Sequence, residues 1–276
     1  MRTPAQTTSL PEQKPPPRRQ RSEPVALRRF AATVSYDGAA FAGSQLQPNA
    51  RTVQGVLEEA VERLFGTPTR VRLAGRTDAG VHAVGQVAAW DADTRLDPAT
   101  IGRALNALLP EDVAVRDVRE TDPRFDPRRW ARRRRYRYTL LVARERQPLL
   151  RRTTWHVGPG LDVAAMQRTA DALVGRRDFA ACAGPLPAGR SSIRTIYLAA
   201  WRSDGCCLLF DIEADAFLPQ MVRRIVGALV QVGRGRLSTE QFCELLRQAK
   251  PATIGPAAPA HGLCLWSVSY DEGYDQ

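Results

Sequence analysis

The chain of 276 residues has few lysines, few histidines and no long apolar run. Each shortage bears on which kinds of site or protein the chain can form. No apolar run approaches the roughly 18 residues that a membrane helix needs, so we expect no membrane association. Three histidines and five cysteines, without CxxC spacing or a ligand-like pairing, predict neither a metal site nor a disulfide framework. Free thiols are typical of a reducing compartment, so we expect a cytoplasmic protein.

Lysine occurs only at Lys14 and Lys250, so 38 of the 40 basic residues are arginine. A GC-rich genome also produces such a bias, and the bias alone therefore identifies no site. The formal net charge of +11 nevertheless predicts a polyanionic partner, with nucleic acid first. A guanidinium group suits this role because its planar fork matches phosphate.

Composition and periodicity divide the chain into three regions. Residues 1–27 are rich in proline, glutamine and arginine without apolar periodicity, and predict a disordered, weakly basic tail. Residues 28–125 predict an N-terminal α/β domain, and residues 126–276 a C-terminal α/β domain. We expect the two domains to join near residues 121–131.

The first domain alternates strand and helix patterns in the order β-α-β-β-α-β, as a ferredoxin-like or RRM-like half does. Thr52 is placed to cap the first of its two helices. Asp97-Pro98 opens the second helix, because proline suits a first helical position. The predicted strands and helices cover residues 30–36, 53–65, 69–74, 84–91, 98–108 and 113–118.

The second domain repeats this order more loosely. Ser238 and Gln241 form a capping box for a short helix near its end. The other predicted elements are strands at 135–142, 193–201, 207–214 and 263–268, and helices at 162–174 and 216–232.

The most informative segment is AGRTDAGVHA at residues 74–83, followed by GQV at 85–87. It lies between two predicted strands, so residues 77–80 should form a turn. Aspartate and glycine suit turns, and a carboxylate on a loop tip can project into a cleft. Composition alone therefore leaves Asp78 either a turn former or a catalytic residue.

This segment resembles the signature of the tRNA pseudouridine synthase A family, whose catalytic aspartate matches Asp78. Similar pieces occur in the family's order along the chain, namely YDG at 36–38, RRYRY at 134–138, DF at 178–179 and MVR at 221–223. The resemblance covers roughly residues 30–270. The resemblance implies two α/β halves that share one extended antiparallel sheet around a central catalytic cleft. It also implies a homodimer that uses no metal and no organic cofactor.

The resemblance further implies isomerisation of uridine to pseudouridine in the anticodon arm of tRNA, at positions 38, 39 and 40. The N1–C1′ bond breaks, the uracil rotates, and C5 bonds to C1′. Three roles stay open for Asp78, namely attack on C1′, attack on C6, and a deprotonation that forms a glycal. Because a stacked uridine cannot be attacked in place, the nucleotide must flip out.

Further site residues are carried over from the same resemblance. Arg223 matches the cation that favours ionised Asp78, and it falls on the polar arc of its predicted helix. Tyr136 is implied to stack on the flipped uracil, and Arg76 to contact its phosphate or the catalytic loop. His82 is open to two interpretations, a base or a structural histidine.

Seven arginines lie between residues 128 and 137. A strand places alternate residues on opposite faces, so only some of them can contact one RNA. We expect salt-sensitive phosphate contacts from Arg128, Arg132, Arg134 and Arg135. The chain also departs from the family pattern: Ser44 stands where many relatives have tryptophan, and Pro219-Gln220 replaces a polar or histidine pair. These departures bear on substrate contacts rather than on the reaction.

Two other functions stay open at this point. A non-catalytic RNA-binding protein of two RRM-like halves would share the basic surface, although no aromatic RNP1-like octapeptide is present. A pseudouridine synthase with different RNA targets would share the catalytic segment.

Overall fold

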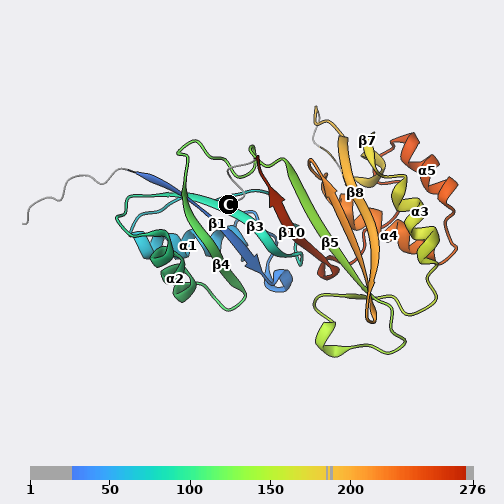
Figure 1. Cartoon of the computed structure of the whole chain (residues 1–276), viewed down its shortest axis with the longest axis horizontal. Helices are drawn as coiled ribbons and strands as arrows, with labels where there is room; N and C mark the ends of the chain where they lie inside the picture. Colours follow the sequence, from blue (N-terminus) through green and yellow to red (C-terminus); the bar gives the residue numbers. More distant parts are fainter. Residues whose placement is uncertain (1–26, 185, 187–188, 272–276) are drawn as a thin grey trace, which may run out of the picture.

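The computed structural model describes residues 27–184, 186 and 189–271. Its ten strands form one mostly antiparallel sheet along the length of the molecule, with helices gathered at its two ends (Figure 1). The strand order is β4-β1-β3-β10-β5-β9-β8-β7, while the short β2 pairs with β3 and β6 pairs with β5. The predicted fold class, two α/β halves that share an extended antiparallel sheet, is confirmed.

The first half has the predicted β-α-β-β-α-β order. Its helices begin where the sequence indicates, because the side chains of Thr52 and Asp97 accept hydrogen bonds from the backbone of the first turn. Its elements are β1 (Arg28–Tyr36), α1 (Val53–Phe65), β2 (Arg72–Leu73), β3 (His82–Ala92), α2 (Pro98–Leu108) and β4 (Val113–Thr121).

The second half contains two strands that the sequence does not predict, β6 and β7. With two and four residues they are too short for a periodic pattern. The elements are β5 (Arg133–Leu141), β6 (Trp155–His156), α3 (Val163–Asp171), β7 (Gly175–Asp178), β8 (Ile193–Asp204), β9 (Cys207–Ala214), α4 (Met221–Gly233), α5 (Thr239–Gln248) and β10 (Leu263–Ser269). The capping box of Ser238 and Gln241 is present at the start of α5.

The last strand joins the two halves. β10 runs parallel to β3 at Cys264 and His82, and antiparallel to β5 along most of its length. In Figure 1 the dark red β10 therefore lies between the teal β3 and the green β5. The two halves are consequently fixed to each other by backbone hydrogen bonds and not only by side-chain packing.

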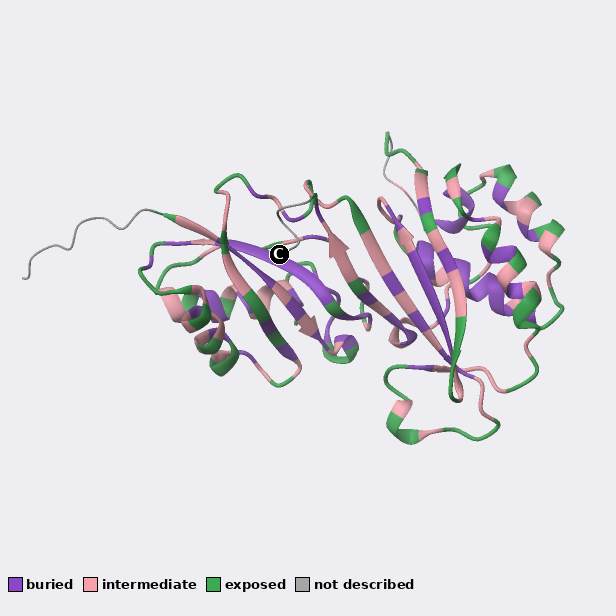
Figure 2. Ribbon diagram, viewed as in Figure 1, coloured by how far each residue is buried: buried purple, intermediate pink, exposed green. Residues whose placement is uncertain are grey.

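One apolar core runs along the helix-bearing face of the sheet. It includes Phe30 and Trp90 in the first half and Tyr138 and Phe210 in the second, together with the inner sides of the helices. Figure 2 shows buried residues on the central strands and on the helix sides that face them. A smaller cluster around Phe125 lies apart from this core.

The predicted helix over 216–232 is shorter at its beginning than expected. Gln220 adopts a left-handed conformation with φ 61°, and α4 begins only at Met221. Pro219 precedes this turn, and the apolar Phe217 and Leu218 line a cleft instead of extending the helix. The predicted strand at 69–74 also shortens to β2, and the helix over 162–174 ends at Asp171.

No helix in the described residues is long and apolar enough to cross a membrane. The predicted tail at 1–27 lies outside the described residues except for Leu27. The division into separate domains at residue 125 stays a prediction.

Candidate active site

A cleft of about 410 Å³ lies on the helix side of the sheet, and both halves contribute to it. The loop between β2 and β3 supplies Asp78, β5 supplies Tyr136, and the first turn of α4 supplies Arg223. These side chains are far apart in sequence. The strand order brings them together, since β10 holds β3 beside β5.

Asp78 and Arg223 form an ion pair across the cleft. Nη1 of Arg223 donates to Oδ2 of Asp78 at 3.0 Å, and its Nε donates to the carbonyl oxygen of Ala258 at 2.8 Å. The side chain of Arg223 is 18% exposed, whereas that of Asp78 is 38% exposed. The arginine is therefore fixed by protein contacts, and its partner carboxylate remains open to a ligand.

Tyr136 forms part of the apolar wall beside this pair. Its ring meets Phe217 edge-on, with centroids 5.2 Å apart, and only 7% of the residue is exposed. Burial raises the pKa of the Tyr136 phenol, which favours its neutral form. Tyr138, two residues later, is fully buried and donates to the carbonyl oxygen of Pro259, which is a packing role.

Guanidinium groups gather along the remaining wall. Burial lowers the pKa of Arg128, and the nearby charges of Arg76, Arg190 and Arg134 lower it further. Arg134 is held by carbonyl oxygens, at 2.7 Å from Asp215 and 3.1 Å from Ala74. Like charges held at close range favour an anionic ligand, because an anion relieves their repulsion.

Sequence reasoning missed two residues of this wall, Arg190 and Arg194. Arg194 donates through Nη1 to the carbonyl oxygens of Ser191 and Ile193, while its buried Nε has no hydrogen-bond partner among the described residues. Nothing in the local sequence separates these arginines from the many others. Only the return of β8 into the sheet brings them to the cleft.

The structure does not bring Arg132 and Arg135 to the cleft. Arg132 pairs with Asp271 at 2.7 Å. Arg135 points away from Tyr136, its neighbour on the strand, and lies 3.3 Å from Asp211 on the opposite face of the sheet. Of the four predicted RNA-binding arginines, only Arg128 and Arg134 therefore line the cleft.

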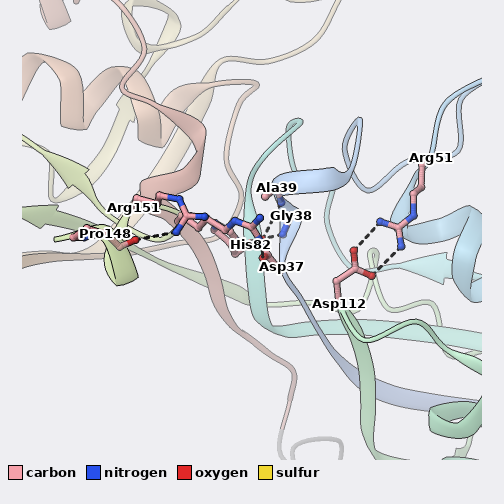
Figure 3. A network of polar contacts seen from close by, with 9 residues as sticks. Asp37, Gly38, Ala39, Arg51, His82, Asp112, Pro148 and Arg151 are labelled. Carbon is pink, nitrogen blue, oxygen red and sulfur yellow. Dashed lines mark hydrogen bonds and ion pairs between the residues drawn. The ribbon is translucent and has the colours of Figure 1, made fainter. Parts of the chain in front are cut away.

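His82 lines a different hollow, of about 480 Å³, together with Arg137 and Trp266. Its Nδ1 accepts a hydrogen bond from the backbone of Gly38 at 3.0 Å, near Asp37 (Figure 3). Its Nε2 lies 2.7 Å from the carbonyl oxygen of Arg152. One ring nitrogen thus contacts the first half of the molecule and the other contacts the second half. These contacts favour the structural interpretation of this histidine.

Arg76 is exposed and lines the cleft. It also lines a neighbouring hollow, and Asp78 lines both the cleft and this hollow. Gln220, one of the departures from the family pattern, lines both hollows. Within the described part of the chain, no three His, Cys, Asp or Glu side chains are grouped to hold a metal ion. The site can thus present a carboxylate, paired with a cation, to a planar base beside an aromatic ring.

Comparison with known proteins shows which family the chain resembles. The family model described as tRNA pseudouridine synthase matches residues 32–128 and 169–271. A tRNA pseudouridine synthase A from Geobacter sulfurreducens is 43% identical over 88% of this chain and all of its own length. The same named protein from Chloroflexus aurantiacus is 46% identical over 90% of each chain, and that from Myxococcus xanthus is 44% identical over 90% of this chain and 94% of its own.

Proposed function

The chain belongs to the tRNA pseudouridine synthase family, and we propose that Asp78 is the catalytic carboxylate of this isomerase. The enzyme forms pseudouridine in tRNA. One observation carries the assignment of Asp78: its partly exposed carboxylate pairs with Arg223 inside a cleft that both halves build.

Arg223 supports catalysis by holding the Asp78 carboxylate in place in a site that is partly closed to water. Its Nη1 donates to Oδ2 of Asp78 at 3.0 Å, so the fixed guanidinium complements the charge of the carboxylate. The hydrogen bond from Arg223 to Ala258 fixes the guanidinium, so the pair needs little reorganisation during the reaction.

The reaction breaks the N1–C1′ bond and forms a C5–C1′ bond, while C5 loses a proton and N1 gains one. The product is therefore an isomer of the substrate, and the reaction consumes no other reactant. The Asp78 carboxylate attacks C1′, attacks C6, or deprotonates the ribose to give a glycal, and each route requires it to be ionised. Tyr136 and Phe217 supply the aromatic wall on which a rotating uracil can stack.

We propose that the target uridine is flipped out of the anticodon arm at positions 38, 39 and 40. A base inside a stacked stem cannot reach Asp78 without leaving the stack. Arg76, Arg128 and Arg134, with Arg190 and Arg194, would hold the phosphates on either side of the flipped nucleotide. Recognition would then depend on tRNA shape and backbone more than on base identity.

The experiment that tests the carboxylate is release of tritium from C5-labelled uridine in unmodified tRNA. Asp78→Asn should lower the release rate by about 10²–10⁴-fold or more, while tRNA still binds. Asp112→Asn is the matched control, because Asp112 also pairs with an arginine, Arg51, but lies outside the cleft. Wild-type release that persists in Asp78→Asn would refute the assignment.

The same assay tests the target position. Replacing U38, U39 and U40 by cytidine should abolish release, and continued release would indicate another target. We also propose a cytoplasmic homodimer, a location with which the five free cysteines agree. Sedimentation at micromolar concentration tests the dimer, and a single 30.5 kDa species would contradict it.

A further inference from the structure

We propose that two buried polar side chains, Ser44 and Gln86, are positioning residues that hold the catalytic loop on both sides of Arg76. The proposal rests on the proposed role of Asp78. Neither side chain reaches the cleft wall that contains Tyr136 and Arg223, and both are fully buried. Their polar atoms instead form hydrogen bonds with the backbone of the loop.

Ser44 holds the residue directly before Asp78. Its Oγ accepts a hydrogen bond from the backbone N–H of Thr77 at 2.8 Å, and its own N–H donates to the carbonyl oxygen of Thr77 at 3.1 Å. Both polar groups of the Thr77 backbone are therefore fixed by one residue. A displacement of Thr77 would move Asp78 with it, because the two share a peptide bond.

Gln86 holds the residue directly before Arg76 in the same two-sided way. Its Oε1 accepts from the N–H of Gly75 at 3.3 Å, and its Nε2 donates to the carbonyl oxygen of Gly75 at 2.9 Å. Its Oε1 also accepts from the N–H of Val87 at 3.1 Å, which fixes the amide against β3. The loop is thus tied to the sheet on one side and to the Ser44 segment on the other.

The Ser44 segment is itself anchored. The N–H of Gln54, in the first turn of α1, donates to the carbonyl oxygen of Ser44 at 3.0 Å. Gly43 has φ +111°, and a Cβ atom there would lie 3.0 Å from the carbonyl oxygen of Thr77. Tyr36 adds a third contact, since its hydroxyl lies 2.9 Å from Oγ1 of Thr77. The loop backbone is therefore packed too closely to shift while these bonds remain.

This arrangement determines whether the Asp78 carboxylate meets the flipped nucleotide in a reactive geometry. Arg223 reaches Asp78 from the other half of the molecule, so a change in loop position alters that pair directly. Misplacement of a catalytic group by about 1 Å can lower a rate by about 100-fold without changing substrate binding. Ser44 and Gln86 consequently act on kcat through Asp78.

The test compares Ser44→Ala with Thr169→Ala in the tritium-release assay. Ser44→Ala removes the acceptor for the Thr77 N–H, and should lower kcat about tenfold or more while KM and tRNA affinity stay within about twofold. Thr169 is also fully buried, and its hydroxyl bonds to Ala165 and Thr239 in the second half. Thr169→Ala should therefore reduce stability without changing kcat.

A second variant keeps the proposal testable if Ser44→Ala does not fold. Gln86→Met preserves side-chain length and removes both bonds to Gly75, so it should also lower kcat selectively. Hydrogen exchange of the peptide covering residues 75–80 should be faster in both loop variants and unchanged in Thr169→Ala. If the kcat values of Ser44→Ala and Gln86→Met lie within twofold of that of Thr169→Ala, the proposal is overturned. Turnover that persists in Asp78→Asn would instead contradict the proposed function.

Discussion

The two faces of β5 carry similar residues in different surroundings. On the cleft face, Arg134 is bound by carbonyl oxygens and lies near other arginines. On the opposite face, Arg133 pairs with Glu213 at 2.9 Å, and Arg137 pairs with Asp211 at 2.9 Å. The positive charge of the opposite face is thus partly neutralised by carboxylates, whereas Arg134 in the cleft is held by neutral carbonyl oxygens and keeps its charge for a ligand.

Aromatic rings reinforce this difference. The guanidinium of Arg137 lies 3.6 Å from the ring centroid of Trp266, and that of Arg133 lies 4.4 Å from the ring of Tyr197. These stacked arginines have their planar faces occupied and their donors directed to carboxylates. A run of arginines in the sequence therefore does not identify a nucleic-acid surface until the partners of each side chain are known.

The largest expected effect comes from replacing one arginine in the cleft by alanine and comparing it with the same replacement on the opposite face of the sheet. Arg223→Ala removes the cation beside Asp78 and should lower kcat about 10²–10³-fold, with a much smaller change in tRNA affinity. Arg137→Ala also removes the arginine partner of an aspartate, but it should lower stability by about 2 kcal/mol and leave kcat unchanged. Measured kcat and Kd for both variants check this. Equal losses of kcat and affinity in Arg223→Ala would make Arg223 a phosphate contact only.

The second effect is expected from the carboxylate of the opposite face, and it concerns stability rather than catalysis. Burial alone would raise the pKa of Asp211, but the hydrogen bond from Arg137 and the charge of Arg135 bring it below its ordinary value. Asp211→Asn would leave these arginines unpaired beside a buried site, and should reduce stability by about 3 kcal/mol at pH 7.

The pH dependence of this effect has a definite sign. A carboxyl with a lowered folded-state pKa stabilises the protein above its unfolded pKa of about 3.9, and this stability is lost as the pH falls further. Urea unfolding of wild type and Asp211→Asn should therefore give a constant difference from pH 7 to pH 5 and a shrinking one below about pH 4. A difference that grows on acidification would contradict the assignment.

The smallest effect should come from replacing single arginines, and it should be seen in the affinity for tRNA. Arg128→Gln removes a cleft cation and should weaken binding several-fold, reducing the salt slope of log K by about 1. Arg135→Gln, on the opposite face beside Asp211, should leave both quantities unchanged. Titrations of tRNA at several salt concentrations distinguish the two, and equal slopes in both variants would remove the distinction between the faces.

Much of the fold is predictable from local pattern. The caps at Thr52 and Ser238 and the proline at Pro98 mark three helix starts correctly, because each acts within the first turn of its helix. The late start of α4 is not predictable in this way. Its apolar periodicity continues backward through Phe217, but the left-handed Gln220 interrupts the helix.

The candidate site is predictable only in part. Asp78, Tyr136 and Arg223 come from the family resemblance, and the structure brings all three to one cleft. Arg190 and Arg194 carry no signal of their own, and neither does the neutralisation of Arg135 by Asp211. The buried bonds from Ser44 to the loop are equally invisible, since a serine between glycine and glutamine gives no periodic pattern.

The sequence by itself determined most of the longer helices and strands, the basic character and the segment that identifies the family. These properties depend on neighbours within a few residues or on residue identities alone. Only the tertiary structure decided that β10 lies between β3 and β5, and that this placement brings Asp78 to Arg223. The same pairing decides which arginines face the cleft and which meet carboxylates. The reason is physical: strand order and side-chain partners are set by contacts between residues far apart in the chain, and their energies appear only when the sheet has formed.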